Sequence, residues 1–355
     1  MAEKTVIKPA IAEAFGKFME RERILFFSAP CGFGKSTVAK ALLRGKKSLY
    51  ISAAESGSVI PKKCGAWDVL LIDDAQYILD NDWQTLCSLI RSSSKMRFVI
   101  LSRGAPPACL MAFQYTGLMT VITAEKLLFD RDDIRRLFQN AASEATDSEI
   151  SGILKESAGY PLGVAITARC MEGGRPFGPD VAAQSYREVF LYFEAEIYRR
   201  FDLPLRRLLL ELAPFESFDT DMARMVNGDP RAGELLDWLQ RNTTMLRYDG
   251  IRQLRFWPKF RTFLLWEMER EYTEEKRRAL FNRGGLYYEL KEDYSHALEC
   301  YTKGGDHSKV SELLIRNSEL HPGMGHYSEM EKYYRSLPES EILASPALMQ
   351  GMSML

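Results

Sequence analysis

The stretch FFSAPCGFGKSTVAKALL, residues 26–43, constrains the fold of this chain more than any other. The apolar run before Pro30 has the length of a buried strand, and Lys35 opens a segment with helical spacing. Gly32 and Gly34 lie between them and permit a tight turn that side chains would hinder. A strand, a glycine turn and a helix N-terminus direct backbone N–H groups at one point, where an anion binds. The stretch therefore predicts a phosphate-binding loop.

The loop pattern calls for glycine at its first fixed position, where this chain has Ala29, which is a mild departure. We expect Lys35 to reach the β- and γ-phosphates and Ser36 to offer its hydroxyl to Mg²⁺. The alternative is a chance Gly-Lys-Ser in an ordinary turn, and the order strand, loop, helix argues against it. The residues expected around the nucleotide here are Ala29, Pro30, Cys31, Gly32, Phe33, Gly34, Lys35, Ser36 and Thr37.

Two further apolar runs end in charged residues. In WDVLLIDDAQ, Asp73 would hold Mg²⁺ through water, and Asp74 would orient or deprotonate the attacking water. In FVILSR, Arg103 would sense the γ-phosphate or stabilise the transferred charge. The alternatives are two aspartates that cap a helix and a surface arginine that begins a loop. Asp73, Asp74 and Arg103 are therefore the candidate catalytic residues.

Five short apolar runs predict the strands of one sheet. Because helix-like segments lie between several of them, the sheet should be parallel, with ligands bound beyond its carboxyl ends. From 126 onward, segments that begin at Asp130 and Asp147 are typical of amphipathic helices capped by those aspartates. The predicted strands are 24–29, 48–52, 68–73, 97–102 and 119–122.

The chain divides into four predicted domains: an α/β phosphate-loop (P-loop) NTPase core at 1–125, a helical lid at 126–184, a winged helix at 185–270 and a helical arm at 271–355. The winged helix is indicated by three helical segments, two short strands around Asp249-Gly250 and a last helix. The arm consists of helical pairs like those of a tetratricopeptide (TPR) solenoid, and it lacks a capping helix. We expect this chain to be part of a longer protein.

Composition excludes several function classes. The net charge of the 355 residues is -1, so the chain as a whole does not favour nucleic acid or an anionic membrane. Its six scattered cysteines and short apolar runs suit a cytoplasmic protein without a membrane partner. All four histidines follow residue 295, which excludes Ser–His–Asp or Cys–His catalysis before that point.

Two features leave alternatives open. Cys31 lies in the loop near a helix N-terminus, so it is either a redox-sensitive thiol or a small residue that the turn tolerates. A basic cluster near the predicted hairpin is either a solvated or internally clamped face or a contact for DNA. The cluster consists of Arg247, Arg252, Arg255, Lys259 and Arg261.

The motifs APCGFGKST, LLIDDAQ, VILSR and AGYPLGVA, in this order, resemble the signal-transducing ATPases with numerous domains (STAND), and among them the MalT-like large LuxR-type regulators. This resemblance covers essentially the whole chain. It implies that Pro161, in the Gly-x-Pro of Gly159-Tyr160-Pro161, lies against the adenine and that Gly159 is among the nucleotide-binding residues. It also implies that the segment from Val6 to Pro9, which includes Ile7 in VIKPAI, flanks the base. One departure is Trp257, with Pro258 next to it, where family members tend to carry histidine.

The resemblance implies a switch in a transcriptional regulator that binds ATP or ADP with Mg²⁺. ATP would hold a self-associating state, ADP a closed monomer, and slow hydrolysis by a weak Mg²⁺-dependent ATPase would reset it. A small-molecule inducer would bind a more distal sensor, and promoter DNA would bind a C-terminal helix-turn-helix outside this chain. The alternative is a stand-alone ATPase scaffold for protein partners, and the gene downstream of Leu355 would separate the two.

Overall fold

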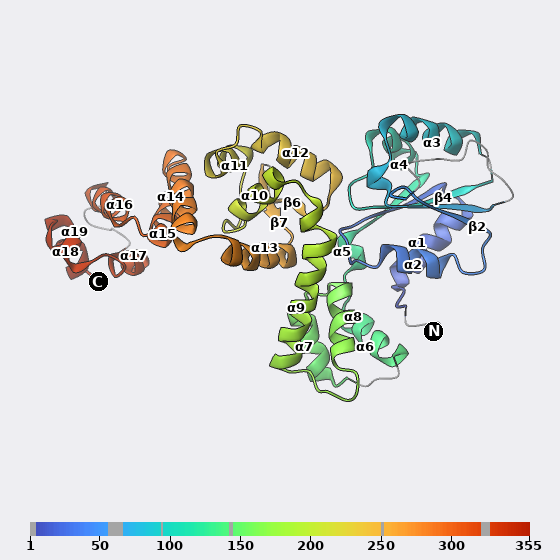
Figure 1. Ribbon diagram of the computed structural model, residues 1–355, viewed down its shortest axis with the longest axis horizontal. Coiled ribbons are helices and arrows are strands. Elements are labelled where there is room, and N and C mark those ends of the chain that lie inside the picture. Colours follow the sequence, from blue (N-terminus) through green and yellow to red (C-terminus); the bar gives the residue numbers. More distant parts are fainter. Residues whose placement is uncertain (1–4, 56–66, 94, 142–144, 250–251, 321–326) are drawn as a thin grey trace. The chain divides into compact units, whose positions relative to one another are not determined.

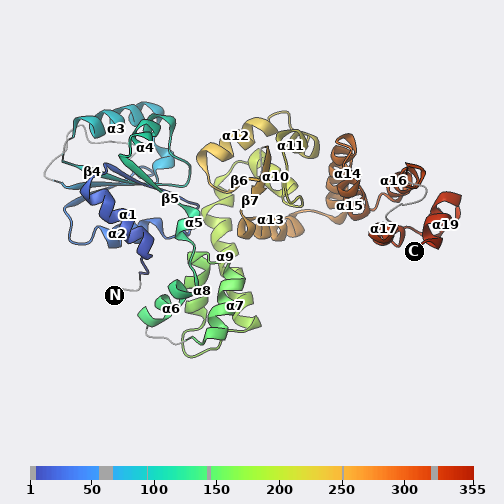
Figure 2. The same cartoon turned by 180° about the vertical axis from the view of Figure 1, so that it is seen from behind.

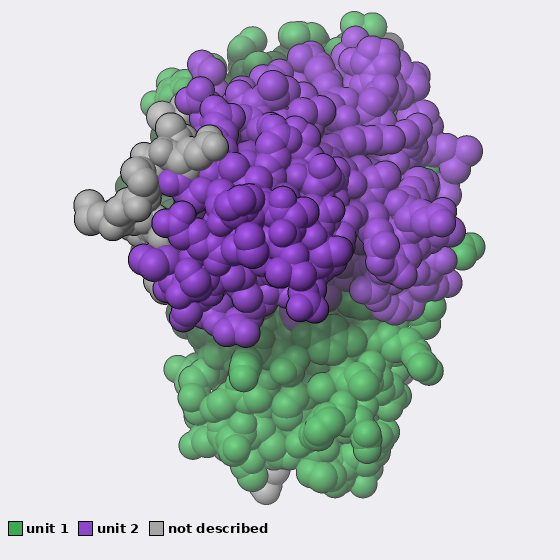
Figure 3. Space-filling view, turned by 90° about the vertical axis from the view of Figure 1, so that its left-hand side faces the viewer, with its two compact units in different colours: residues 1–201, 238–246 green, residues 202–237, 247–355 purple. Residues whose placement is uncertain are grey.

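The computed structural model describes residues 5–55, 67–93, 95–141, 145–249, 252–320 and 327–355. Contacts between residues divide the chain into two compact units, coloured separately in Figure 3. Unit 1 comprises residues 1–201 and 238–246, and unit 2 comprises residues 202–237 and 247–355.

Unit 1 contains a five-stranded sheet in which every pairing is parallel, in the order β2-β3-β4-β1-β5. The predicted parallel sheet is confirmed, and each predicted strand is found within about a residue of its expected limits. The strands are β1 (Ile24–Ser28), β2 (Ser48–Ser52), β3 (Val69–Asp73), β4 (Arg97–Ser102) and β5 (Met119–Thr123).

Helices cover both faces of this sheet, which explains why every residue of β1 and β3 is buried. Helices α3 and α4 lie on one face, and α1 and α2 lie on the other (Figure 1 and Figure 2). Phe26, Leu70 and Phe98 pack with Trp83 and Leu86 of α3 in the core of the first face. The bounds are α1 (Pro9–Glu20), α2 (Lys35–Leu42), α3 (Asp80–Ser92) and α4 (Met111–Tyr115).

The strand order decides which loops meet. Strand β4 lies between β1 and β3, with Ser28 opposite Ser102 and Ile72 opposite Ile100. The loops that follow these three strands therefore leave the same edge of the sheet side by side. This places the phosphate loop, Arg103 and the aspartate pair at one site.

Five helices follow the sheet within unit 1. Asp130 caps α6 as predicted: its carboxylate accepts the Asp133 N–H, and its own N–H donates to the Asp133 carboxylate. Helix α7 is capped by Thr146 and not by the predicted Asp147. The misplaced cap has a physical reason, because Thr146 and Glu149 form a capping box that puts Asp147 inside the first turn. The bounds are α5 (Ala124–Leu127), α6 (Arg131–Asn140), α7 (Asp147–Ser157), α8 (Pro161–Cys170) and α9 (Pro179–Glu196).

A winged-helix order of elements comes next. The second strand is followed at once by a helix that begins at Pro258, and Phe218 pairs with Leu254 in an antiparallel bridge. Asp249 ends the first strand as expected for the hairpin, while Gly250 lies outside the described residues. The elements are α10 (Leu203–Leu212), α11 (Thr220–Asn227), α12 (Ala232–Asn242), β6 (Leu246–Asp249), β7 (Gln253–Phe256) and α13 (Pro258–Glu271).

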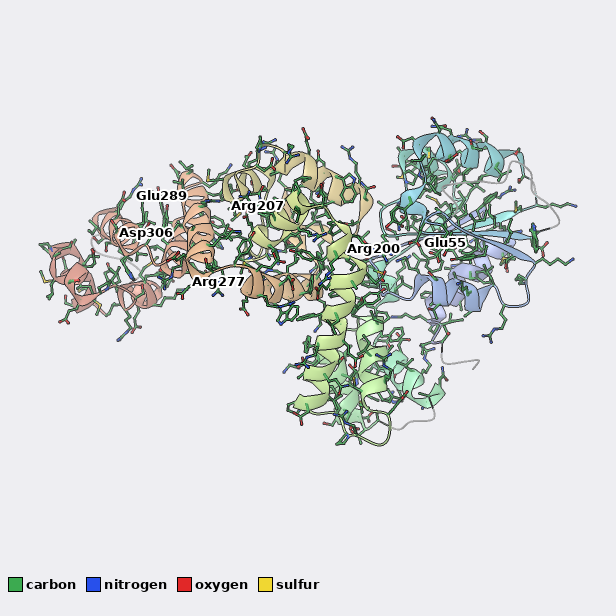
Figure 4. All side chains as sticks on the ribbon, in the orientation of Figure 1. Glu55, Arg200, Arg207, Arg277, Glu289 and Asp306 are labelled. Atoms are coloured by element: carbon green, nitrogen blue, oxygen red, sulfur yellow. The ribbon has the colours of Figure 1, made fainter. Side chains whose placement is uncertain are left out.

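A buried carboxylate ties the helices of this region together. Glu211 of α10 is 1% exposed and accepts hydrogen bonds from Arg207 at 2.9 Å, Asn227 at 2.7 Å and the Tyr272 hydroxyl at 3.2 Å. Arg207, labelled in Figure 4, also donates to the Asn227 carbonyl oxygen at 2.9 Å. Burial and the Glu211 charge together raise the pKa of Tyr272. The network therefore joins α10, α11 and the end of α13.

The basic cluster is partly engaged inside unit 2. Arg261 donates to the carbonyl oxygens of Ala213 at 2.9 Å and Pro214 at 3.0 Å, so it caps the end of α10. Arg255 pairs with Glu216 at 3.2 Å and also with Asp249. At least two of the five basic residues are thus held by the protein itself, which favours the internal-clamp interpretation.

The described residues after α13 are mostly helical, as predicted. Helix α14 packs against α15, and Gly285 leaves room for the Tyr301 ring there. Among the described residues, no helix combines the length and apolar character needed to cross a bilayer. The bounds are α14 (Glu274–Leu290), α15 (Tyr294–Gly304), α16 (His307–Leu320), α17 (Tyr327–Tyr334), α18 (Glu339–Leu343) and α19 (Pro346–Ser353).

The four-domain division stays a prediction. Helix α9 runs without a break through the expected boundary at 184–185, and α13 runs through the one at 270–271.

Candidate nucleotide-binding site

A cavity of about 440 Å³ opens in unit 1 where the phosphate loop leaves the sheet. One end is polar and charged, and the other is mostly apolar. The polar end is lined by Cys31, Gly32, Phe33, Gly34, Lys35, Ser36, Thr37, Asp73, Asp74, Arg103 and Tyr192. The apolar end is lined mainly by Val6, Ile11, Leu127, Phe129, Leu137, Pro161, Leu162 and Ala165.

The backbone of the loop is shaped to hold an anion. Gly32 and Gly34 have φ of +79° and +75°, in the left-handed region that favours glycine. The first N–H bonded within α2 belongs to Val38, which donates to the Gly34 carbonyl oxygen at 2.8 Å. The preceding N–H groups, from Lys35 onward, therefore have no carbonyl partner within the helix and are available for a phosphate.

Lys35 is held at this anion site by the loop itself. Its ammonium donates to the carbonyl oxygens of Ala29 at 2.7 Å and Pro30 at 2.9 Å. The side chain is 9% exposed, and this burial lowers its pKa to about 8. A buried cation of this kind gains stability when a negatively charged ligand binds beside it.

The aspartate pair ends β3. Asp73 is 9% exposed, accepts the backbone N–H of Asp74 at 2.9 Å and lies 3.4 Å from the Tyr50 hydroxyl. Burial and then the Asp73 charge raise the pKa of Tyr50 to about 12. Asp74 has φ of +54°, a left-handed conformation that non-glycine residues seldom adopt. Strain of this kind is common where a side chain must be aimed at a ligand.

Arg103 follows β4 and reaches three groups. Its Nη2 lies 3.7 Å from Asp74, its Nη1 donates to the Glu196 carbonyl oxygen at 3.3 Å, and its backbone N–H donates to Gln76 at 3.0 Å. Burial alone would lower its pKa, but Cys31 and Asp74 outweigh this and raise the pKa of Arg103. Because Glu196 is the last residue of α9, the guanidinium also caps that helix.

The lid is hydrogen-bonded directly to the phosphate loop. The Tyr160 hydroxyl donates to the Cys31 carbonyl oxygen at 3.0 Å, and the Leu162 N–H donates to that of Gly32 at 3.1 Å. A Cβ on Gly32 would lie 1.9 Å from the Tyr160 hydroxyl, so only glycine fits. The Tyr192 hydroxyl of α9 lies 2.7 Å from the Cys31 sulfur. Helices α8 and α9 thus both contact the loop.

The N-terminal segment closes the apolar end. Lys8 pairs with Asp133 at 3.0 Å and Asp130 at 3.7 Å, and it also donates to the Leu128 carbonyl oxygen. Asp133 is fully buried, so this pair fastens the segment before α1 to the start of α6. Val6 is 5% exposed and is thereby held at the cavity wall.

Most residues predicted for the site line the cavity: Val6, Cys31 to Thr37, Asp73, Asp74, Arg103 and Pro161. Ile7 is not among its lining residues, and its carbonyl oxygen accepts from Arg136 at 3.2 Å. Ala29 and Pro30 are not among the lining residues either, and their carbonyl oxygens accept hydrogen bonds from the Lys35 ammonium. Gly159 has φ of +73° and accepts the Phe129 N–H at 2.8 Å, which shapes the lid.

Several residues of the site were not predicted. Ala165 lies in α8 and Tyr192 in α9, where the sequence carries no phosphate-binding pattern, and Phe129 precedes a helix cap. Lys8 lies in the segment from Val6 to Pro9 that was expected to flank the base, but its pairing with Asp133, more than a hundred residues away, was not predicted. Only the fold brings these residues together.

The residues present fit a nucleotide with Mg²⁺. The glycine turn and Lys35 suit phosphates, the apolar end suits a base, and Ser36 and Asp73 are the oxygen donors that would hold the ion. Mg²⁺ keeps several waters and binds mainly through phosphates, so two protein donors suffice.

Comparison with known proteins gives a more specific result. Residues 194–276 match the family described as the MalT winged helix domain. Over 327 residues it is 21% identical to the HTH-type transcriptional regulator MalT of Vibrio parahaemolyticus, covering 90% of the chain and 36% of that regulator. The chain thus spans about a third of the length of this curated relative.

Solved structures extend the comparison. A Walker-type ATPase of Pyrococcus abyssi matches with a TM-score of 0.55 and 14% identity, over 73% of this chain and 96% of that one. A STAND protein with a tetratricopeptide repeat sensor from Pyrococcus horikoshii matches 99% of this chain and 56% of its own, with 14% identity and a TM-score of 0.38. The first match shows the P-loop ATPase fold. Together with the MalT domain, it confirms the resemblance to MalT-like regulators.

Proposed function

We propose that this chain is the ATP- and ADP-dependent switch of a signal-responsive transcriptional regulator. The observation that carries the proposal is the cavity of unit 1, where the phosphate loop and the aspartate pair share one space with an apolar pocket. The MalT winged-helix domain in the same chain supports a regulatory role for the bound nucleotide.

The residues have distinct roles in this proposal. Lys35 and the N–H groups at the start of α2 bind the phosphates, and Pro161 packs against the adenine. Mg²⁺, held by Ser36 and through water by Asp73, would neutralise charge on the phosphates. Asp74 orients or deprotonates the attacking water, and Arg103 senses the γ-phosphate.

Contacts between the lid and the phosphate loop would let the bound nucleotide control the conformation of the chain, as in a regulatory switch. Tyr160 and Leu162 bond to carbonyl oxygens of the same loop that wraps the phosphates. A change in the phosphates therefore changes the contacts that hold the lid. ATP favours a self-associating state, ADP favours a closed monomer, and hydrolysis resets the switch.

The whole regulator would have further partners. A small-molecule inducer binds a more distal sensor, and promoter DNA binds a C-terminal helix-turn-helix outside this chain. The regulator acts in the cytoplasm and has no membrane partner. The printed name of the Vibrio relative, an HTH-type transcriptional regulator, supports this assignment.

Calorimetric titration tests the nucleotide site. Mg²⁺ with ATP, ADP or GTP is titrated into the nucleotide-stripped chain and into Lys35→Ala, with the exposed Lys46→Ala as the matched control. We expect adenine nucleotides to bind the wild type and the control. In Lys35→Ala the affinity should fall by about a hundredfold or more, because the variant would lose two charge-assisted contacts between the ammonium and the phosphates. Equal affinity in Lys35→Ala would overturn the site. Light scattering with ATP and with ADP then tests the self-association.

A further inference from the structure

Gln76 lies just after the aspartate pair, in the 3₁₀ helix Ala75–Tyr77, and contacts both partners of the Asp74–Arg103 pair. Its side-chain Nε2 donates to Asp74 Oδ1 at 2.9 Å. Its Oε1 accepts the backbone N–H of Arg103 at 3.0 Å. We infer that Gln76 is a positioning residue that holds the carboxylate of Asp74 and the loop of Arg103 in the geometry needed for nucleotide hydrolysis. This inference rests on the proposed function.

The amide of Gln76 can take only one orientation here. A carboxylate only accepts and a backbone N–H only donates, so the NH₂ group must face Asp74 and the oxygen must face Arg103. In the reversed orientation, the amide oxygen would face the Asp74 carboxylate, and the NH₂ group would face the Arg103 N–H. Glutamine is therefore matched to its two partners, which neither an apolar residue nor a carboxylate could satisfy together.

The contact with Asp74 fixes a strained residue. Asp74 has φ of +54°, and its Oδ1 is shared by the Gln76 amide and the Arg103 guanidinium, the latter at 3.7 Å. With Oδ1 engaged, the other carboxylate oxygen is left to accept a proton from water. Without Gln76, Oδ1 would keep only the longer contact to Arg103.

The contact with Arg103 links two neighbouring strands. Asp74 follows β3 and Arg103 follows β4, and these strands are paired up to Ile72 and Ile100. Beyond that point the Gln76 amide continues the connection between them, so the acid and the cation move together. The Arg103 side chain is then set between Asp74 and the last carbonyl of α9.

Gln76 acts through these neighbours and not on the nucleotide. It is absent from the lining of the nucleotide cavity and lines a second one of about 200 Å³, which shares Arg103 with the first. Substituting Gln76 should therefore change hydrolysis and recognition of the γ-phosphate while leaving ADP affinity unchanged.

Two substitutions separate the roles of the amide. Gln76→Met keeps the length and removes both hydrogen bonds. Gln76→Glu keeps an acceptor for Arg103 but places a carboxylate beside Asp74. The matched controls are Gln84→Met and Gln84→Glu, at an exposed position of α3 in the same unit.

The measurements are single-turnover hydrolysis of Mg²⁺-ATP, and calorimetric affinities for ADP and a non-hydrolysable ATP analogue. In Gln76→Met we expect hydrolysis to fall by about tenfold to a hundredfold, which is at or below the lower end of the roughly 10²–10⁴-fold that a general base contributes. ADP affinity should stay within about twofold of the wild type. If the wild type binds but does not hydrolyse, the analogue-to-ADP affinity ratio decides, and it should fall in Gln76→Met.

The outcomes distinguish the two proposals. A wild type that binds no nucleotide overturns the proposed function and this inference together. A wild type that binds and hydrolyses ATP, with Gln76→Met and Gln76→Glu equal to their Gln84 controls, overturns the role of Gln76 alone. Loss of ADP affinity in Gln76→Met would show a general structural role and would also overturn it.

Discussion

Replacing Lys35 by methionine removes a buried amine while keeping a side chain of similar length. In the folded, nucleotide-free chain burial lowers the pKa of Lys35 from 10.5 to about 8, whereas the unfolded chain keeps the ordinary value. Between these pKa values the unfolded chain binds more protons than the folded chain, so the stability of the wild type rises with pH. The methionine variant lacks this pH-dependent contribution to the free energy of unfolding.

The size of the effect follows from the shift. The wild type should gain about 2 kcal/mol relative to Lys35→Met between roughly pH 7 and pH 9.5, and about 3 kcal/mol once the pH passes the unfolded value. The comparison cancels every other group that titrates in this range, provided that its pKa is the same in both chains. The hydrogen bonds to Ala29 and Pro30 are absent from the variant at every pH, so their loss offsets the two curves and does not produce the rise between them.

Urea denaturation at a series of pH values gives the free energy of unfolding for the wild type, Lys35→Met and the exposed control Lys46→Met. We expect the wild-type and Lys46→Met curves to run parallel, and both to rise against Lys35→Met above about pH 8. Saturating Mg²⁺-ADP should flatten the rise, because phosphates favour the charged amine. A constant difference between the wild type and Lys35→Met across the range would refute the burial argument.

Two further substitutions have matched controls. Gly32→Ala places a Cβ 1.9 Å from the Tyr160 hydroxyl, whereas a Cβ on Gly34 meets no atom within 4 Å. Calorimetric unfolding should therefore show a loss of about 1 kcal/mol for Gly34→Ala, from its left-handed backbone, and clearly more for Gly32→Ala; equal losses would contradict the close approach. Glu211→Ala leaves three donors without their acceptor and should destabilise the chain by about 3 kcal/mol, whereas the exposed Glu269→Ala should change stability by less than about 0.5 kcal/mol.

The strands and the phosphate loop could be predicted because their signals are local. Apolar runs of five or six residues between turn residues locate the strands, and Gly32, Gly34 and Lys35 locate the loop. The charged residues after β3 and β4 could then be placed at one edge, because parallel strands end on the same side. Their order in the sheet, with β4 between β1 and β3, depends on pairing between distant segments and carries no local signal.

The parts of the site that come from α8 and α9 could not be predicted from spacing. Tyr192 lies 161 residues after Cys31, and its hydroxyl meets the sulfur only because α9 packs along α8 and ends at the sheet. Gln76 was visible in the motif LLIDDAQ, but its role depends on the left-handed Asp74 and on the neighbouring β4. Sequence patterns thus located the groups that touch phosphate better than those that hold them in place.

Helix α9 has a mechanical consequence for how a nucleotide could act at a distance. Its 18 residues span about 27 Å at the usual rise of an α-helix. Within its first half, Ser185 bonds to Thr167 of α8 at 2.7 Å, and at its end the Glu196 carbonyl accepts Arg103. Between these two points, the Tyr192 hydroxyl contacts the Cys31 sulfur of the phosphate loop. A turn of Arg103 toward a γ-phosphate would therefore break the contact at the end of α9, while the contact with α8 would remain.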